Sequence, residues 1–146
     1  MSVVRTGAVE VPLPVYKSAG AAGMDLHAAL REPRLLEPGK RALIPTGLRL
    51  AIPAGYEGQV RPRSGWALDK GVGIVNSPGT IDSDFRGEIG IVLINHGAEP
   101  VWIEPLQRIA QLVIAPVIQV QLCEVDELDT TVRGKGGYGS SGVDAE

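Results

Sequence analysis

The chain has 146 residues, of which 44% are hydrophobic and 21% charged, and its formal net charge is −3. This length predicts one domain that folds without disulfide bonds, and the composition excludes a disordered chain. The net charge argues against a general nucleic-acid-binding protein, which would carry a basic stripe. We expect a cytoplasmic protein, because neither a signal peptide nor an apolar run of about 18 residues is evident.

Glycine and proline divide the sequence into short segments. There are 19 Gly and 11 Pro residues, so long helices have almost nowhere to form. The β-rich runs between them are, in chain order, RALI, LRLAI, GQVRPR, GVGIVN, EIGIVLIN, PVWI, RIAQLVIAPV and VQLCEV. The run GIVLI is apolar throughout and is predicted to be buried on both faces. Short strands with Gly and Pro turns predict an all-β sandwich, jelly roll or barrel.

Two segments depart from this strand pattern. GWALDKG, residues 65–71, predicts a single helical turn with glycine at either end. From about Glu127 the composition becomes polar and glycine-rich, which predicts a barrel at residues 1–126 and a flexible C-terminal arm at 127–146. Cys123, the only cysteine, lies in VQLCEV and is expected to be a small core residue rather than a nucleophile.

Polar residues and glycine gather beside the apolar strands in five stretches: AGAAGMDLHA (19–28), RPRSGWAL (61–68), GIVNSPGTIDSDFRGEIGIVLIN (73–95), RIAQLVIAPV (108–117) and RGKGGYGSSG (133–142). In this order and spacing they resemble the five motifs of the trimeric dUTP pyrophosphatases (dUTPases), over residues 17–142. The resemblance implies a distorted jelly-roll barrel, assembled as a homotrimer with shared active sites. It also implies hydrolysis of dUTP to dUMP and pyrophosphate, which limits uracil incorporation into DNA and supplies dUMP.

The stretch PRSG places a guanidinium, a hydroxyl and a glycine amide next to one another, a combination that suits a phosphate oxygen. A solvated arginine followed by an N-cap serine explains the same residues equally well. The resemblance implies that Arg63, Ser64 and Gly65 bind the phosphate chain. Gln111 lies in an otherwise apolar strand, where it is either a further phosphate ligand or a polar residue on an outer face.

The stretch NSPGTID is typical of a hairpin around Pro78. The resemblance implies that this loop holds uracil, and the residues concerned are Asn76, Gly79, Thr80 and Ile81. Cytosine would leave buried hydrogen-bonding groups unpaired, whereas thymine, which differs by one methyl group, must be excluded by a wall of backbone. Phe85 stands where the family commonly has tyrosine, and its ring is implied to stack on the deoxyribose and exclude a 2′-hydroxyl.

Asp82 and Asp84 lie in IDSDFRG, where carboxylates are commonly solvated turn residues. The resemblance implies that Asp82 holds and activates the attacking water. Asp25, in GMDL, is implied to act through water on Mg²⁺, which bridges the three phosphates without a direct protein ligand. Arg108 is expected to pair with an acidic neighbour.

The glycine-rich tail resembles a lid that closes over the nucleotide and excludes water. Tyr138 would stack on the base, Arg133 would meet the γ-phosphate, and Ser140 and Ser141 would add hydrogen bonds to phosphate. Without the other four motifs, a disordered solubilising tail would be the simpler interpretation.

Two alternatives remain open at this point. As the resemblance implies, a dCTP deaminase-like enzyme of the same fold would need a glutamate where this chain has Val92. A nucleotide-binding protein without catalysis, or a purely structural β-domain, would not need Arg63, Asp82, Gln111 and Arg133 together. His27 and His96, with a single cysteine, do not form a recognisable zinc site.

Overall fold

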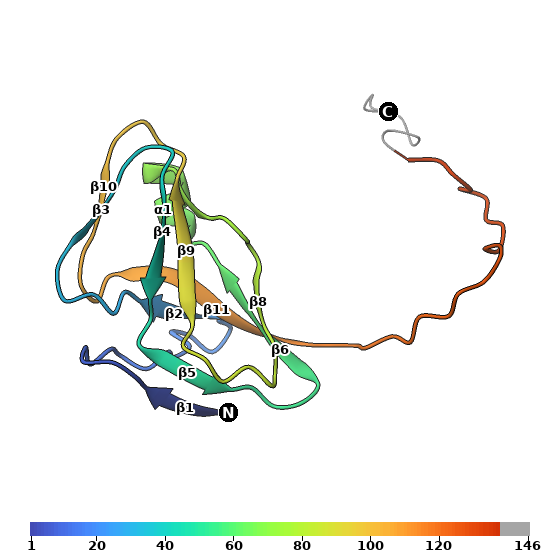
Figure 1. The fold of residues 1–146 in the computed structure, drawn as a ribbon, viewed down its shortest axis with the longest axis horizontal. Coiled ribbons are helices and arrows are strands. Elements are labelled where there is room, and N and C mark those ends of the chain that lie inside the picture. Colours follow the sequence, from blue (N-terminus) through green and yellow to red (C-terminus); the bar gives the residue numbers. More distant parts are fainter. Residues whose placement is uncertain (138–146) are drawn as a thin grey trace.

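The structure, a computed structural model, describes residues 1–137. Tyr138, Ser140 and Ser141 lie outside the described residues. Within them the chain forms eleven strands and one helix: β1 (Ser2–Arg5), β2 (Gly23–His27), β3 (Arg34–Leu36), β4 (Arg41–Pro45), β5 (Leu48–Ala51), β6 (Tyr56–Arg61), α1 (Ser64–Lys70), β7 (Val72–Ile74), β8 (Gly79–Ile81), β9 (Gly90–Asn95), β10 (Val101–Ile103) and β11 (Arg108–Pro116). The prediction of an all-β fold is confirmed (Figure 1).

The strands form two larger sheets and two strand pairs, all antiparallel. One sheet has the order β2-β11-β6-β8 and the other β4-β9-β7, while β1 pairs with β5 and β3 with β10. Both larger sheets contribute to one core, in which Leu26, Ile44, Leu93 and Leu112 are 1% exposed or less. Burial of each such side chain contributes roughly 1.5–3 kcal/mol. This shared core fixes the position of one sheet relative to the other.

Burial alternates along β9, although its sequence is apolar throughout. Ile91 and Leu93 are buried, whereas Val92 and Ile94 are only half-buried. The outer face of this sheet also carries the exposed Leu43 of β4, which lies opposite Val92. The prediction that this strand is buried on both faces is therefore wrong for the described part of the chain. Only one face of the sheet packs on the core.

The segment NSPGTID does not form the predicted hairpin. The strand before it, β7, pairs with β9, and the strand after it, β8, pairs with β6, so the two flanking strands belong to different sheets. The Ser77–Pro78 peptide bond between them is cis. Turn residues predict where a chain changes direction, but they do not say with which strand each flank pairs.

The predicted helical turn is confirmed as α1, although it starts one residue earlier than expected. Arg63 is its N-cap residue, so Ser64 is the first helical residue and not the cap. Gly71 ends the helix in the left-handed conformation, with φ 66°, and its N–H donates to the Ala67 carbonyl at 3.2 Å. No helix in residues 1–137 is long and apolar enough to span a membrane.

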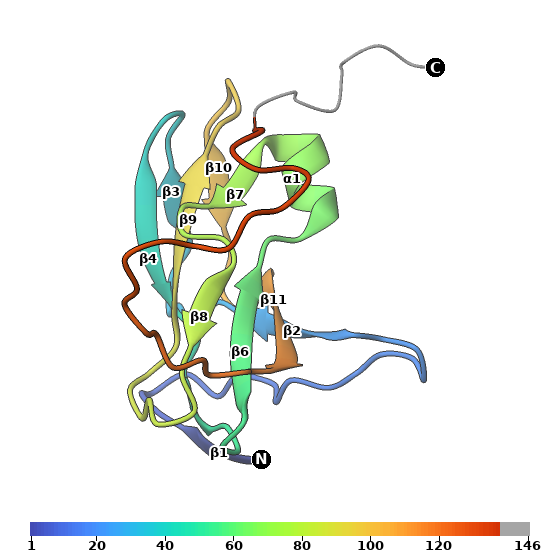
Figure 2. The same cartoon turned by 90° about the vertical axis from the view of Figure 1, so that its right-hand side faces the viewer.

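After β11 the chain leaves the barrel as an extended segment (Figures 1 and 2). No strand is present between residues 117 and 137, so VQLCEV does not form the predicted strand. Cys123 is exposed, and its assignment to the core is also wrong. The apolar side chains of Ile118, Val120 and Leu122 are 75–91% exposed, because the segment does not return to the core of its own chain. The domain boundary at residue 126 remains a prediction.

Candidate active site

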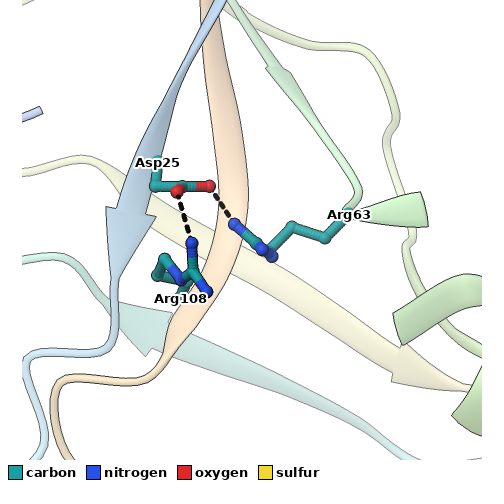
Figure 3. Close-up of polar contacts among 3 residues, drawn as sticks. All are labelled: Asp25, Arg63 and Arg108. Carbon is teal, nitrogen blue, oxygen red and sulfur yellow. Dashed lines mark hydrogen bonds and ion pairs between the residues drawn. The ribbon is translucent and has the colours of Figure 1, made fainter. Parts of the chain in front are cut away.

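Three charged residues from separate parts of the sequence meet at one end of the first sheet, the one with the order β2-β11-β6-β8 (Figure 3). The carboxylate of Asp25, on β2, forms ion pairs with Arg63 at the start of α1 and with Arg108 at the start of β11. Arg108 Nη1 lies 3.2 Å from Asp25 Oδ2. The expectation that Arg108 pairs with an acidic neighbour is confirmed. Asp25 is buried, so its charge is neutralised locally by two cations.

Gln111 lies beside this ion-pair group. On β11 it is directly opposite Asp25 of β2 on one side and Arg61 of β6 on the other. Its Oε1 atom would be 3.3 Å from a Cβ placed on Gly23, so the Gln111 side chain covers the glycine of β2. Asp25, Arg63, Arg108 and Gln111 are called the Asp25 cluster below. The exposed Ser64 and Gly65 follow Arg63 directly in α1.

His27 lies next to the Asp25 cluster, opposite Arg108 in the β2–β11 ladder. Burial lowers the pKa of His27 below its usual value of 6.5, and the charges of Arg108, Lys17 and Arg63 lower it further, while Asp25 opposes them. Its Nδ1 atom is buried without a hydrogen-bond partner among the described residues. Both effects favour the neutral imidazole.

The described residues do not offer a metal site built from side chains. Residues 1–137 contain no group of three or more His, Cys, Asp or Glu side chains that could hold a metal ion. Both carboxylate oxygens of Asp25 accept from an arginine, which makes Asp25 a poor direct ligand for a cation. A Mg²⁺ ion therefore fits this chain only when a ligand such as a triphosphate supplies most of the oxygen atoms around it.

A second group of predicted residues lies around β8. Thr80, Asp82 and Asp84 line a cleft of about 660 Å³, together with Tyr56 and Glu57 of β6. Asp82 is exposed, and its backbone carbonyl accepts a hydrogen bond from the Phe85 N–H at 3.1 Å, which closes a turn. A carboxylate on an open polar cleft is accessible to water, as a general base requires.

Asn76 and Gly79 lie together at the start of β8. The Asn76 Nδ2 atom would be 3.2 Å from a Cβ placed on Gly79, so the amide lies against the glycine backbone. Gly79 is buried, whereas Asn76 and Thr80 are exposed. Ile81 is half-buried and packs against the core. The segment from residue 76 to residue 81 thus combines a fixed backbone with accessible polar groups.

One chain does not bring the two groups together. In the β6–β8 ladder, Gly58 lies opposite Ile81, so Asp82 is level with the start of β6. Arg63 follows the other end of β6, beyond Arg61. A strand rises about 3.3 Å per residue, so the two ends of β6, five steps apart, are separated by roughly 17 Å, and Arg63 lies beyond the end that is far from Asp82. Asp82 and the Asp25 cluster of one chain therefore lie at opposite ends of the same strand.

Arg133, the remaining predicted residue within the described part, lies in the extended C-terminal segment. It is exposed, and its Nε atom donates to the carbonyl of Gly136 at 2.9 Å. This local contact closes a short turn in the glycine-rich stretch. In the single chain, the Arg133 side chain therefore contacts its own turn.

Comparison with known proteins identifies the family. The dUTPase family model matches residues 9–142. The chain belongs to the dUTPase family. The predicted dUTPase resemblance is thereby confirmed. A dUTPase relative from Methylocella silvestris, named deoxyuridine 5′-triphosphate nucleotidohydrolase, is 59% identical over 138 residues, which cover 93% of this chain and 86% of the relative.

Solved dUTPase structures share the fold. Staphylococcus bacteriophage 80alpha dUTPase with dUpNHpp superimposes with a TM-score of 0.88 at 29% identity, covering 97% of this chain and 98% of the phage chain. A mutant dUTPase from phage phi11 of Staphylococcus aureus, described with a structural Mg(II) ion, gives a TM-score of 0.77 at 26% identity, covering 86% of this chain and 96% of that one. Both neighbours support the all-β dUTPase fold of this chain.

The cleft around β8 also contains residues that the sequence did not single out, among them Tyr56 and Glu57. Tyr56 and Glu57 line the cleft beside Asp82 because β6 pairs with β8. They are the first two residues of β6, which the sequence predicted only from Gly58 onward, as GQVRPR. The missing information was the strand pairing, which a single sequence with two or more compatible partners does not supply.

Proposed function

We propose that this chain hydrolyses dUTP to dUMP and pyrophosphate, by in-line attack of water on the α-phosphorus. Membership of the dUTPase family is the observation that carries this function. The deaminase alternative needs a carboxylate at position 92, and Val92 is an apolar side chain half-buried opposite Leu43. A protein that only bound nucleotide would not need an exposed carboxylate on the cleft, as Asp82 provides.

The Asp25 cluster is proposed to hold the phosphate chain. Arg63 and Gln111 supply N–H donors at the same end of the sheet, and Ser64 and Gly65 follow as the first residues of α1. The first N–H groups of a helix have no acceptor within the helix, so they remain available to an anion. Bonds from these donors to phosphate oxygens stabilise the charge that develops in the transition state.

The segment from Asn76 to Ile81 is proposed to recognise uracil. Asn76 and the backbone of Gly79, Thr80 and Ile81 offer donors and acceptors to the polar edge of the base. Hydrogen bonds from a fixed backbone can favour uracil over cytosine by up to about 10⁴-fold in kcat/KM. Thymine is excluded because the same backbone leaves no room for its methyl group. Phe85, beyond the turn, is proposed to stack on the deoxyribose.

Asp82 is proposed to orient the attacking water and to accept its proton. In that role it must face a phosphate chain held by an Asp25 cluster, and the cluster of its own chain lies at the far end of β6. We therefore propose a homotrimer in which Asp82 of one copy meets the cluster of another. The tail, with Arg133, Tyr138, Ser140 and Ser141, is proposed to close over the nucleotide as a lid.

Mg²⁺ is proposed to arrive with the triphosphate and to neutralise part of its charge. The chain offers it Asp25 only through water, since both carboxylate oxygens already bind arginines. The protein groups named above bind, orient and exclude water without a direct bond to the metal.

The function is tested by measuring pyrophosphate release from dUTP, dCTP, dTTP and UTP, each with and without Mg²⁺. We expect release from dUTP alone, and ammonia release from dCTP or the absence of any turnover would contradict the proposal.

The shared active site is tested by mixing two inactive variants of the chain. Chains carrying Asp82→Asn and chains carrying Arg63→Gln should each be inactive but regain part of the activity when unfolded and refolded together. No recovery in mixed trimers would contradict the shared site.

A further inference from the structure

Arg86 holds the turn that carries Asp82 and Phe85. Its Nη1 atom donates hydrogen bonds to the carbonyl oxygens of Ser83, at 2.7 Å, and Phe85, at 2.8 Å. The same turn is closed from within by the Phe85 N–H, which donates to the Asp82 carbonyl at 3.1 Å. One guanidinium thus binds two carbonyl groups of a four-residue turn. Hydrogen bonds from a charged donor are stronger than bonds between neutral groups.

Arg49 of β5 connects this turn to the barrel. Its neighbours Leu48 and Leu50 point into the core, so Arg49 points outward along the surface. Its Nε atom donates to the carbonyl oxygen of Arg86 at 2.5 Å, across 37 positions of sequence. The two arginines therefore act in series, with Arg49 bound to the backbone of Arg86 and Arg86 bound to the backbone of the turn.

The chain beyond Arg86 is anchored in a similar way. The Gly47 N–H donates to Glu88 Oε1 at 2.8 Å, and Thr46 Oγ1 donates to the carbonyl of Ile89 at 2.7 Å. Both contacts are at least partly buried, so residues 88 and 89 are fixed to the region between β4 and β5. The hydrogen bond from Arg49 adds a third such contact, at residue 86, next to the exposed turn.

The ring of Phe85 depends on the same short segment. A Cβ placed on Gly87 would be 2.5 Å from the Phe85 Cζ atom, so the ring lies directly on the Gly87 backbone. Arg86 lies between these two residues, so its hydrogen bonds fix the backbone that joins the Phe85 ring to the glycine on which the ring lies. A shift of the turn therefore moves both the Asp82 carboxylate and the Phe85 ring.

We propose that Arg86 and Arg49 are positioning residues for dUTP hydrolysis. Arg86 keeps Asp82 and Phe85 in fixed positions relative to each other, and Arg49 keeps Arg86 fixed to β5. Neither arginine needs to touch the nucleotide. The inference rests on the proposed function, in which Asp82 orients water and Phe85 packs on the sugar. A misplacement of about 1 Å at a reacting group costs about 100-fold in rate.

The variants Arg86→Ala, Arg86→Lys and Arg49→Ala test this inference. Arg34→Ala is the matched control, because Arg34 Nη1 also donates to a backbone carbonyl, that of Leu43 at 3.1 Å, at an exposed position. The kcat and KM for dUTP and for UTP are measured for each variant, together with its thermal midpoint.

We expect Arg86→Ala to lower kcat for dUTP by about 10- to 100-fold and to narrow the preference for dUTP over UTP, since both turn residues are displaced. Arg49→Ala should change the same two quantities in the same direction and to a smaller extent. Arg86→Lys keeps a charged donor that reaches one carbonyl, and it should fall between Arg86→Ala and the unaltered chain. The Arg34→Ala variant should match the unaltered chain.

The possible outcomes separate this inference from the function on which it rests. An unaltered chain that releases no pyrophosphate from dUTP overturns the proposed function. If the unaltered chain is active and both Arg86→Ala and Arg49→Ala have the same kcat and the same preference for dUTP over UTP as that chain, only the role of the arginines is overturned. An equal loss in Arg34→Ala also overturns that role, because the loss would then follow from charge alone. If Arg86→Ala does not fold, unchanged kinetics in both Arg86→Lys and Arg49→Ala overturn the inference.

Discussion

Asp25 on β2 and Arg63 at the start of α1, 38 positions apart in sequence, form an ion pair that joins the first sheet to the only helix of the described chain. The side chain of Asp25 is 8% exposed and that of Arg63 is 22% exposed, so the pair is mostly shielded from water. Arg108 binds the other carboxylate oxygen. A single carboxylate thereby orients a proposed phosphate ligand before any nucleotide binds.

Replacing Asp25 by asparagine should weaken both folding and turnover. The amide group would present a donor to one of the two arginines, and the free energy of unfolding should fall by about 1 to 3 kcal/mol. Arg108 is half exposed and can turn toward solvent, which keeps the loss below that of a fully buried pair. Urea unfolding and dUTP turnover measure the two effects. Asp69→Asn, at an exposed position of α1, is the control and should change neither.

Replacing Asp82 by asparagine should separate binding from chemistry. The amide keeps the size of the side chain but cannot accept a proton from water, so kcat should fall by about 10²- to 10⁴-fold. The affinity for dUpNHpp, measured by calorimetry, should change little. Asp84→Asn is a close control, since Asp84 lines the same cleft two positions later. Equal losses of turnover in both variants would remove the distinction between these two carboxylates.

A methyl group at position 87 should weaken the preference for deoxyribonucleotides over ribonucleotides. In Gly87→Ala the new Cβ would meet the Phe85 ring at 2.5 Å, and the ring must move away from the backbone. We expect the ratio of kcat/KM for dUTP to that for UTP to fall, as it should in Phe85→Ala. Phe85→Tyr should retain the ratio, because the ring remains. An unchanged ratio in Gly87→Ala would show that the position of the ring does not determine sugar selection.

Leu106→Gly should stabilise the protein. Leu106 has φ 60°, a left-handed conformation in the turn between β10 and β11, which costs a side-chain-bearing residue about 1–2 kcal/mol. Glycine removes this cost but loses more conformational entropy on folding, so we expect a net gain of about 0.5–1 kcal/mol in the free energy of unfolding. Chemical denaturation measures the gain. Leu106→Ala keeps a Cβ and should show no such gain.

The pKa of His27 gives a pH dependence of known sign. The folded pKa lies below the usual value of 6.5, so the unfolded chain binds more protons than the folded chain as the pH falls through that value. Stability from this group is therefore complete above about pH 6.5 and decreases as the pH falls below it. The unfolding free energy of the unaltered chain should decrease more between about pH 7.5 and pH 5.5 than that of His27→Gln. Parallel decreases in the two chains would contradict this prediction.

The sequence predicted the strand segments better than their pairing. Glycine and proline limit strand length locally, so RIAQLVIAPV and EIGIVLIN were recognisable as β11 and β9. Their partners depend on contacts between distant residues, and this is why β7 and β8 were expected to pair with each other. Cys123 was placed in the core because its neighbours are apolar, but an apolar pattern does not reveal whether the segment packs on the core of its own chain.

The candidate site shows the same division. The residues of the Asp25 cluster were recognised from their motifs, and Arg108 was expected to pair with a carboxylate. That Asp25 would be this partner depends on the β2–β11 register, which no local pattern contains. Arg49 and Arg86 were not singled out at all, since an arginine that binds a backbone carbonyl leaves no trace in the sequence of its acceptor.

The length of β6 has a consequence for activity in dilute solution. This strand holds the carboxylate of the cleft and the ion-paired arginine apart. With the roles proposed for these two groups, a chain that folds alone cannot hold water and phosphate at one site and cannot complete a turnover. If the proposed trimers dissociate on dilution, specific activity should decline with them. Nucleotide cleavage would begin only once enough copies have accumulated to assemble.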